Sequence, residues 1–280
     1  MTRFDTPDPI SAVISLVAGD VRVIAGDRTD TVVEVRPSDG SNAMDVKAAE
    51  QTRVEFSHGR LLLKAPKWRK YSLFGGGGSI DVAIELPTDS RVDGDIAMGD
   101  FRSEGRLGEC RFKSSTGHIW LGRTGPLQVT TSAGDVTVEE ASGHAEITGC
   151  GDVRIRALGG SAVIKNLNGS SWVGNVTGDL RCNAANGDIS VDRAQATVVA
   201  KTANGSVRIG QVERGCVVLE TAFGQLEVGI RAGTAALLDV ASKFGRVRNS
   251  LDASGSPEPT EQTVELRART SYGDIVIHRA

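Results

Sequence analysis

A row of acidic residues is the first feature of this sequence that suggests chemistry. Aspartate directly follows a recurring glycine at Asp100, Asp135, Asp152, Asp188 and Asp274. If these carboxylates converged, they would suit Ca²⁺, which takes six to eight oxygen ligands, or a reaction on a sugar. Other residues take the same place in four further repeats, namely His118, Ser170, Ser206 and Gln225. Because Gly-Asp is also ordinary turn chemistry, we favour a structural role for the row.

A second group of charges bears on catalysis. Carbohydrate-cleaving β-helices need two or three carboxylates, or a carboxylate beside Arg or Lys, on one face. The candidates for such a cluster are Asp179, Arg181, Asp192 and Arg193. Charges that alternate outward along strands often have no such role, and no histidine pairs locally with Ser or Cys in a nucleophilic arrangement. We therefore expect no enzyme, no catalytic residues, no cofactor and no metal, with a glycan-cleaving activity as the alternative.

The segment 64–78 is the most unusual stretch of the chain. It places four cations beside three aromatic rings, and a run of four glycines follows. Such a composition binds partners through charge and stacking. The alternative is a hairpin loop whose rings pack on the end of the fold. The candidate contact residues are Lys67, Trp68, Arg69, Lys70, Tyr71 and Phe74.

Two tryptophans are further candidates for binding. Trp120 and Trp172 each fall three residues after a recurring glycine, where strand alternation points a side chain outward. An exposed indole ring on a β-face offers a stacking platform, for example for a sugar. Isolated surface aromatics are also common, so both interpretations stay open.

Bulk composition limits the partners and the compartment. The net charge is -3, so no basic field attracts nucleic acid or anionic lipid. No apolar run approaches the roughly 20 residues that cross a bilayer, and the N-terminus lacks the pattern of a signal peptide. The sequence therefore predicts a cytoplasmic protein, with the cell surface reached only by an unrecognised export route.

The state of the four cysteines is not decided by the sequence. They contain no CxxC pair, and both buried thiols and one or two disulfides are compatible with Cys110, Cys150, Cys182 and Cys216.

The elements that must position all these residues are repeats. The recurring glycines are Gly99, Gly117, Gly134, Gly151, Gly169, Gly187, Gly205, Gly224, Gly245 and Gly273. Their spacings are 17 to 19 residues up to Gly224, and then 21 and 28. Apolar and polar residues alternate on both sides of each glycine, which predicts two short strands joined at a corner. The sequence therefore predicts an all-β, single-chain parallel β-solenoid (β-helix) of two-strand coils about 18 residues long, with a sandwich as the alternative.

The residue before the recurring glycine favours the solenoid over the sandwich. In six successive units it is Asn168, Asn186, Asn204, Phe223, Phe244 and Tyr272. Stacked coils place equivalent residues about 4.8 Å apart, where amides form hydrogen-bonded ladders and rings stack. Both runs predict that consecutive coils of the sequence lie directly on one another.

The regularity of the repeat also suggests a domain organisation. Residues 1–95 are less regular and are expected to form an N-terminal β cap that carries the basic-aromatic segment 64–78. Within this cap, Ser41–Gln51 is expected to hold one short helix with Asn42 as its N-cap. Residues 96–280 are expected to form the regular solenoid, with a loop insertion at 252–262.

The repeats carry a family resemblance. Units of the type SxxGDVxV recur from Thr116 to Val228, and the strand Ile80–Leu86 closes with Pro87 just before the regular array. With these features nearly the whole chain resembles DUF4097, a bacterial β-strand-repeat family whose members are described as candidate adhesins. The resemblance implies a β-solenoid with an adhesive or scaffolding role, and it supplies no catalytic residues.

These observations lead to one functional expectation and two alternatives. We expect a non-enzymatic β-solenoid scaffold or adhesin-like binding surface, for protein partners or for self-association. The first alternative is a carbohydrate-binding or carbohydrate-processing β-helix, motivated by Trp120, Trp172 and the acidic corners. The second is an intracellular regulatory protein that docks a partner through Lys64–Phe74. No nucleic acid partner and no membrane insertion are expected.

Overall fold

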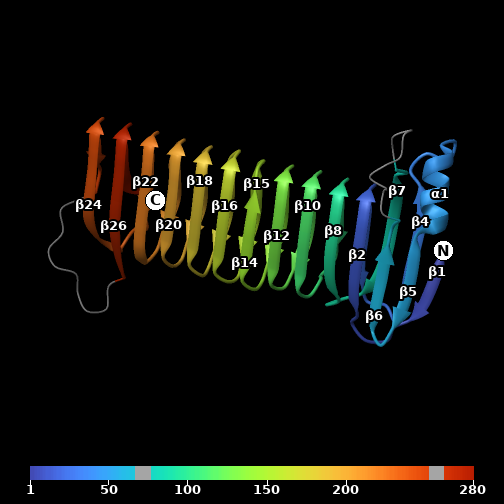
Figure 1. Ribbon diagram of the computed structural model, residues 1–280. Coiled ribbons are helices and arrows are strands. Elements are labelled where there is room, and N and C mark those ends of the chain that lie inside the picture. Colours follow the sequence, from blue (N-terminus) through green and yellow to red (C-terminus); the bar gives the residue numbers. More distant parts are fainter. Residues whose placement is uncertain (67–76, 252–261) are drawn as a thin grey trace. The chain divides into compact units, whose positions relative to one another are not determined.

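The computed structural model describes residues 1–66, 77–251 and 262–280 (Figure 1). The chain divides into two compact units, Met1–Glu139 and Glu140–Ala280. The expected division into 1–95 and 96–280 stays a prediction. Six predicted partner-binding residues lie outside the described residues, namely Lys67, Trp68, Arg69, Lys70, Tyr71 and Phe74. Most of the insertion predicted at 252–262 also lies outside them.

Unit 1 consists of two sheets and one helix. Sheet 1A has the strand order β1 (Thr2–Asp5), β4 (Asp30–Pro37), β7 (Ile80–Pro87), β3 (Val21–Gly26), β9 (Phe101–Glu104) and β11 (Ile119–Thr124). Sheet 1B has the order β12 (Leu127–Ala133), β10 (Cys110–Thr116), β8 (Arg91–Met98), β2 (Ser11–Ala18), β6 (Arg60–Lys64) and β5 (Arg53–Ser57). The pairs β1–β4, β4–β7 and β5–β6 are antiparallel, and the pairs formed by β2, β3, β8 and β10 are parallel. β13 (Val136–Ala141) spans the boundary between the units.

Helix α1 (Ala43–Gln51) contacts β4 in unit 1. The side-chain oxygen of Asn42 accepts a hydrogen bond from the Met44 N–H at 2.9 Å, which confirms the predicted helix and its N-cap. Asp45 is buried, and its two oxygens accept the backbone N–H groups of Ser79 (2.9 Å) and Asp39 (3.1 Å). The Asp45 carboxylate therefore links the helix to the backbone at Asp39 and at Ser79.

Unit 2 consists of two sheets. Sheet 2A has the order β15 (Val153–Leu158), β17 (Ser171–Val176), β19 (Ile189–Ala194), β21 (Val207–Val212), β23 (Leu226–Ile230), β27 (Ile275–Arg279) and β25 (Val247–Asn249). Sheet 2B has the order β14 (Ala145–Gly149), β16 (Ala162–Asn168), β18 (Leu180–Asn186), β20 (Val198–Asn204), β22 (Gly215–Phe223), β26 (Thr263–Tyr272) and β24 (Ala235–Phe244). Neighbouring strands in both sheets are parallel.

The strand register confirms the predicted parallel β-solenoid. Each coil gives one strand to each sheet, and the same position of the next coil lies directly beside it. Ala162 pairs with Leu180, a separation of 180 − 162 = 18 residues, and Ile189 pairs with Val207, again 207 − 189 = 18. Every second residue of a strand therefore points into the space between the sheets, as the alternating sequence predicts.

Inward-pointing aliphatic residues form columns that run from coil to coil. In sheet 2A one such column contains Val173, Val191, Ile209, Val228 and Ile277, each at most 1% exposed. Full burial of one such side chain contributes about 1.5–3 kcal/mol relative to leaving it exposed. A single coil cannot supply this burial, so each coil is stabilised by the neighbouring coils that cover it.

The recurring glycines stack on one another at the coil corners. Gly187 has a φ of +131°, and a Cβ on it would lie 2.1 Å from the carbonyl oxygen of Gly169 in the neighbouring coil. Gly117 has the same φ of +131°, and its Cβ would lie 2.0 Å from the Gly99 oxygen. Both the backbone angle and the close approach exclude any other residue type.

The coil order at the C-terminal end of unit 2 differs from the order predicted from the sequence. β26 lies between β22 and β24, and β27 lies between β23 and β25, so the last coil of the chain is inserted one place inward (Figure 1). The expectation that Phe223, Phe244 and Tyr272 stack in sequence order is therefore wrong, because Tyr272 is in the middle. The inserted coil carries Ile277 where the outer coil carries Asn249, so the more apolar coil takes the doubly covered place.

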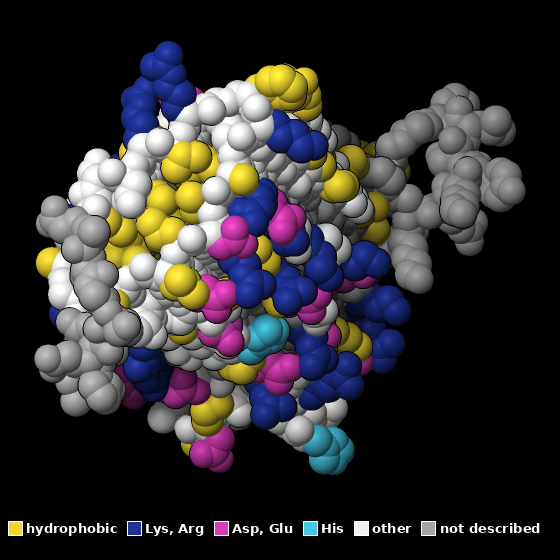
Figure 2. Space-filling view, turned by 90° about the vertical axis from the view of Figure 1, so that its left-hand side faces the viewer, with side chains coloured by type: hydrophobic (Ala, Val, Ile, Leu, Met, Phe, Trp, Pro, Cys, Tyr) yellow, Lys and Arg dark blue, Asp and Glu magenta, His cyan; other side chains and the backbone are white. Residues whose placement is uncertain are grey.

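The outermost coil of unit 2 leaves hydrophobic surface uncovered. Figure 2 views the molecule from the side on which β24 lies, and hydrophobic side chains gather on that face. Val247 is 44% exposed, whereas its neighbour Ile275 is 0% exposed at the same position of the inserted coil. Leu238 and Val240 are half-buried, while their neighbours Leu266 and Ala268 are fully buried.

Unit 1 also contains an inserted coil, here at the start of the sequence. The coil made of β2 and β3 comes first in the sequence, yet it lies between the β6–β7 coil and the β8–β9 coil. Two aromatic rings from opposite sheets meet beyond this coil, Phe4 on β1 and Phe56 on β5, with ring centroids 5.3 Å apart. They cover the N-terminal end of the core.

The four cysteines are free thiols in the structure, which answers the question that the sequence left open. Cys110 and Cys182 are buried, whereas Cys150 and Cys216 are partly exposed. Burial raises the pKa of Cys110 to about 12 and that of Cys182 to about 12, from an ordinary value of 9.0. Both core thiols are therefore protonated and unreactive at neutral pH.

The stacking of glycines predicts a selective loss of stability. Replacing Gly117 by Ala should lower the free energy of unfolding by at least about 2 kcal/mol, because strain and the clash with the Gly99 oxygen add up. The control is Gly26→Ala in the same unit, where no atom lies within 4 Å of the added Cβ. Urea denaturation followed by circular dichroism measures both. Equal stability of the two variants would contradict the corner geometry.

The buried thiols predict a loss of stability at alkaline pH. The unfolded chain releases a Cys182 proton as the pH passes 9.0, whereas the folded chain holds it until about pH 12. Stability is therefore complete below pH 9.0 and falls above it, by up to about 1.4 kcal/mol per pH unit for each thiol. Denaturation midpoints across this range should fall more steeply for the wild type than for Cys182→Ala. Parallel curves would show that burial does not shift this pKa.

Candidate functional site

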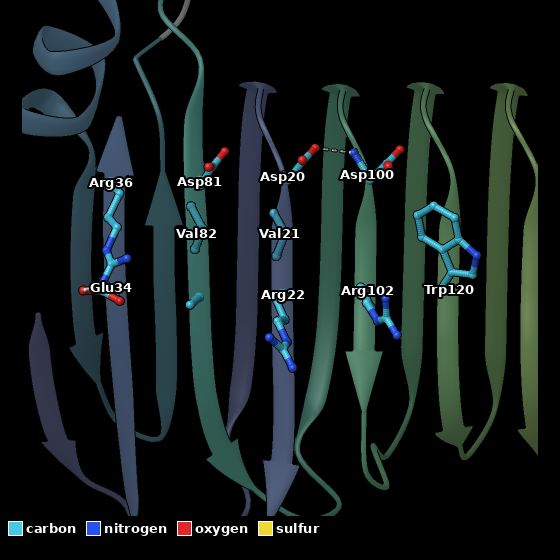
Figure 3. A pocket seen from close by; sticks show the side chains of 11 residues that line it. Asp20, Val21, Arg22, Glu34, Arg36, Asp81, Val82, Asp100, Arg102 and Trp120 are labelled. Atoms are coloured by element: carbon cyan, nitrogen blue, oxygen red, sulfur yellow. Dashed lines mark hydrogen bonds and ion pairs between the residues drawn. The ribbon is translucent and has the colours of Figure 1, made fainter. Parts of the chain in front are cut away.

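A shallow hollow of about 490 Å³ opens on the outer face of sheet 1A (Figure 3). Five neighbouring strands line it, in the order β4, β7, β3, β9 and β11. Ala83 on β7 lines it, and its neighbours across the sheet are Glu34 on β4 and Arg22 on β3. The hollow exists because a methyl group here stands between much longer side chains.

Two arginines continue the row from Ala83 towards β11. Arg22 pairs with Arg102, and Arg102 pairs with Trp120. Like charges directly opposite on neighbouring strands repel each other. Glu104 offsets this repulsion, since its Oε1 accepts a hydrogen bond from Arg22 Nη2 at 2.9 Å and lies 3.6 Å from Arg102 Nε. Exposed pairs of this kind contribute about 0–1 kcal/mol, so both guanidinium groups can still bind a ligand.

Strand β4, at the other end of the row, also carries a charge pair. Arg36 on β4 donates from Nη2 to Glu34 Oε1 at 2.7 Å. Figure 3 shows both side chains at the edge of the hollow farthest from Trp120. The row therefore presents guanidinium groups on both sides of the Ala83 methyl group.

Three aspartates line the upper rim of the hollow in Figure 3. Asp20 Oδ1 accepts the Asp100 N–H at 2.9 Å, and Asp100 Oδ1 accepts the His118 N–H at 2.8 Å. Asp81 Oδ1 accepts the Ser38 hydroxyl at 2.7 Å. A carboxylate offers about four lone-pair sites, so each rim aspartate has capacity for a ligand hydroxyl group.

Trp120 forms the opposite edge of the hollow. Its side chain lies on the outer face of β11, is 38% exposed, and has its ring centroid 5.3 Å from that of His118. Figure 3 looks down on the sheet and shows the indole ring face-on, so the flat side of the ring faces outward. Of the two predicted partner-binding residues that the structure describes, Trp120 lines this hollow and Trp172 does not, and the role of Trp120 in binding stays a prediction.

Trp172 has a different environment. It lies on β17 of unit 2, is half-buried, and donates from Nε1 to Asp192 Oδ1 at 3.1 Å. Its ring covers Gly174, where an added Cβ would lie 3.2 Å from a ring carbon. Because the ring is held by its own sheet, it offers less stacking surface than Trp120, and its predicted role in binding remains untested.

The acidic corners bind the backbone of the next coil. Asp152 Oδ1 accepts the Ser170 N–H at 2.9 Å, and Asp188 Oδ1 accepts the Ser206 N–H at 2.7 Å. The N–H after each corner glycine points back to the preceding coil, and a short acceptor there satisfies it. Within the described ranges, no group of three His, Cys, Asp or Glu residues is arranged to hold a metal ion. This geometry supports the turn interpretation of the acidic row.

The charges considered for catalysis do not form one cluster. Arg181 lies on β18 in sheet 2B, whereas Asp192 and Arg193 lie on β19 in sheet 2A. Asp179 Oδ1 accepts the Thr197 N–H at 3.2 Å, which is another corner contact. These four residues therefore lack the common face that carbohydrate cleavage requires.

The residues before the corner glycines form two contact series in unit 2. Asn186 Nδ2 donates to Asn168 Oδ1 at 2.8 Å, and Asn204 Nδ2 donates to Asn186 Oδ1 at 2.8 Å. Tyr272 stacks on Phe223 at 4.9 Å and on Phe244 at 4.8 Å, with near-parallel rings. The aromatic series ends on the outermost coil, where Phe244 is 65% exposed.

The outermost coil of unit 2 is a second candidate site, which we call the open end. It consists of the half-buried or exposed residues Leu238, Val240, Phe244, Val247 and Asn249. Ten large hydrophobic side chains are exposed among residues 1–66, 77–251 and 262–280, and five of them lie in the last three coils. This concentration of exposed apolar side chains makes the end of unit 2 a candidate interaction surface.

Sequence reasoning missed most residues of the hollow. Arg22, Ala83 and Arg102 are far apart in the sequence and become neighbours only because the β2–β3 coil is inserted between two later ones. Their outward position follows from strand alternation. The strand order that brings them together has no signal in the spacing of the glycines.

Comparisons with known proteins found solved structures that are similar to this chain at low sequence identity. No family model and no curated protein matches the chain, so the resemblance to DUF4097 stays a prediction. A solved candidate adhesin of Bacteroides fragilis NCTC 9343 is 12% identical, with a TM-score of 0.37 over 99% of this chain and 95% of its own. A candidate adhesin of Parabacteroides distasonis ATCC 8503 is 13% identical, with a TM-score of 0.35 over 98% and 95%. At these values the likeness carries no inference about what this chain binds.

None of the helices in the described parts of the chain is long and apolar enough to cross a bilayer.

The acidic corners predict a small, metal-independent loss of stability. Replacing Asp188 by Ala removes the acceptor of the Ser206 N–H and should cost about 0.5–1.5 kcal/mol. Asp188→Asn keeps an oxygen at the same place and should stay closer to the wild type. Thermal melts with and without Ca²⁺ measure both effects. A melting temperature that Ca²⁺ raises in the wild type but not in Asp188→Ala would instead establish a metal site.

Proposed function

We propose that this chain is a non-enzymatic scaffold with an adhesin-like binding surface, and that it joins a second copy of itself through the open end. The observation that carries the proposal is the uncovered core of the outermost coil. Val247 is 44% exposed at a position where Ile275, in the next coil, is 0% exposed. Covering this surface with another protein surface is favourable in proportion to the apolar area that leaves water.

The N-terminal end of unit 1 and the outermost coil of unit 2 differ in whether aromatic rings cover them. This difference indicates which surface of a second copy is the partner. Phe4 and Phe56 meet across the N-terminal end of unit 1 at 5.3 Å. The described residues contain no such pair across the outermost coil of unit 2. A head-to-tail contact would therefore join one open surface to one covered surface. Two open ends related by a two-fold axis cover each other with the same residues, which gives a closed dimer.

The edge strand of the open end offers hydrogen bonds as well as apolar area. β24 is ten residues long, and β26 is its one neighbour among the described strands. An edge of this length exposes backbone N–H and C=O groups along one side. The same strand of a second copy, running antiparallel, satisfies these groups across the two-fold axis. Phe244 and Val247 add apolar contacts beside this strand pair.

The support for a non-catalytic role is separate. The acidic residues that would be needed for carbohydrate cleavage are distributed over corners and over both sheets, where they accept backbone hydrogen bonds. Regular sheets whose described acidic residues are bound to backbone at the corners suit a scaffold that functions by contact.

Self-association through the open end predicts a dimer that one charge disrupts. Val247→Lys places an ammonium group in the contact and should convert the dimer to a monomer, because a buried unpaired charge is strongly unfavourable. Leu167→Lys is the matched control, since Leu167 is 64% exposed on β16, five strands from β24 in sheet 2B. Sedimentation equilibrium over a wide concentration range measures the mass of each protein.

The outcomes decide the proposal in both directions. A dimeric wild type, a dimeric Leu167→Lys variant and a folded monomeric Val247→Lys variant support it. A wild type that stays monomeric, or a Val247→Lys variant that stays dimeric, overturns it.

A further inference from the structure

The hollow around Ala83 has a lining whose chemistry can be compared with that of possible ligands. It lies wholly in unit 1, so it does not depend on the open end of unit 2. Its volume of about 490 Å³ lies within the range of small-molecule sites, which is roughly 300–1,000 Å³. It is open along the sheet, which suits part of a longer molecule more than an enclosed small one.

The charges of the lining argue against a charged ligand. The guanidinium groups of Arg22, Arg36 and Arg102 face four carboxylates, those of Asp20, Glu34, Asp81 and Asp100. An anion attracted by the arginines would meet four negative charges, and a cation would meet three positive ones. With both signs interleaved, the field of the hollow favours neither.

The same side chains suit a ligand rich in hydroxyl groups. A hydroxyl group both donates and accepts, so it can bond to a carboxylate and to a guanidinium group at the same time. Asp100 and Arg102 both line the hollow and are separated by one residue along the chain. Arg22 lies directly opposite Arg102 on the neighbouring strand. The Asp100 carboxylate lies at the upper rim and the two guanidinium groups lie lower in the hollow (Figure 3), so different hydroxyl groups of one ligand can reach the acceptor and the donors.

The indole ring of Trp120 supplies the remaining element. Its face carries a partial negative charge and attracts the weakly positive C–H groups on one side of a sugar ring. In Figure 3 this face is turned outward beside Arg102, so a ring stacked on it would bring its hydroxyl groups over the arginines. Ala83 keeps the space beyond Arg22 free for a further ring.

The length of the site points to more than one sugar unit. From Glu34 to Trp120 the row crosses five strands, which is about 19 Å at the usual strand spacing. A single sugar ring would leave most of this row without contact. An oligosaccharide that runs across the strands would use all of it.

We propose that the hollow binds a neutral oligosaccharide, with one ring stacked on Trp120 and hydroxyl groups bonded to Arg22, Arg102 and Asp100. Binding leaves the ligand chemically unchanged. The site provides a specific ligand class for the binding surface of the scaffold, and it functions in the monomer and in the dimer alike.

The experiment is a glycan microarray that carries neutral and acidic oligosaccharides, followed by calorimetry on the best neutral ligand. Trp120→Ala should lower the affinity at least tenfold, which equals about 1.4 kcal/mol. Ala83→Phe should also abolish binding, because the added ring fills the hollow while the melting temperature stays close to that of the wild type. Trp172→Ala is the matched control for the loss of an indole ring and should keep the affinity.

Each result bears on the proposal. Neutral ligands that lose affinity with Trp120→Ala and Ala83→Phe but not with Trp172→Ala support it. An array without ligands, ligands that are all sulfated or carboxylated, or unchanged affinity in Trp120→Ala overturns it. The Val247→Lys variant should bind the same glycan as the wild type, so failure of the dimer and failure of the glycan site are distinguishable.

Discussion

The contact between stacked corner glycines is the constraint on which the rest of the structure depends. A Cβ on Gly187 would lie 2.1 Å from the Gly169 oxygen, so the coils can approach to strand distance only if the corner has no side chain. This contact sets the register of both sheets in each coil. The register in turn aligns the aliphatic columns of the core, the asparagine series at the corner and the aspartates that accept the N–H of the following coil. The corner glycine thus allows the close approach on which the core columns and both corner series depend.

The repeat makes the two strands of each coil predictable from the sequence. Because the repeats are so alike, the order in which the coils stack is not predictable from it. Glycine spacing and period-two alternation identify the two strands of each coil, and the polar residue Asn42 correctly marks the start of α1. All coils share the same corner and nearly the same core, so the local sequence does not specify which coil lies on which. The order at both ends depends on how well each inward face is covered, as shown by Ile277 inside and Asn249 outside. The hollow could not be predicted from the sequence for this reason. Ala83 and Arg102 lie in one row only because Arg22, on the inserted coil, lies between them.

The inserted coils have a common physical effect on the two ends of the chain. The first coil of the sequence, β2–β3, and the last, β26–β27, are each covered on both sides, so the C-terminal strand is paired where it would otherwise fray. The outermost coil of unit 2, by contrast, contains neither terminus, because it follows β23 and precedes β26 in the sequence. It can therefore remain ordered with its inward face uncovered, as a surface for self-association must. In unit 1 the inserted coil has a different consequence, since it supplies Arg22 to the hollow.

Disulfide trapping of the aromatic series tests the stacking of coils most directly. Phe223 and Tyr272 are paired neighbours, whereas Phe223 and Phe244 are separated by the inserted coil. Two cysteines can bridge only if their Cα atoms are within about 7 Å, and two strand spacings amount to about 9.6 Å. The double variant Phe223→Cys with Tyr272→Cys should therefore form an intramolecular disulfide under mild oxidation, as detected by peptide mass mapping, and Phe223→Cys with Phe244→Cys should not. A bridge in the second variant and none in the first would mean that the coils stack in sequence order, and would contradict the account.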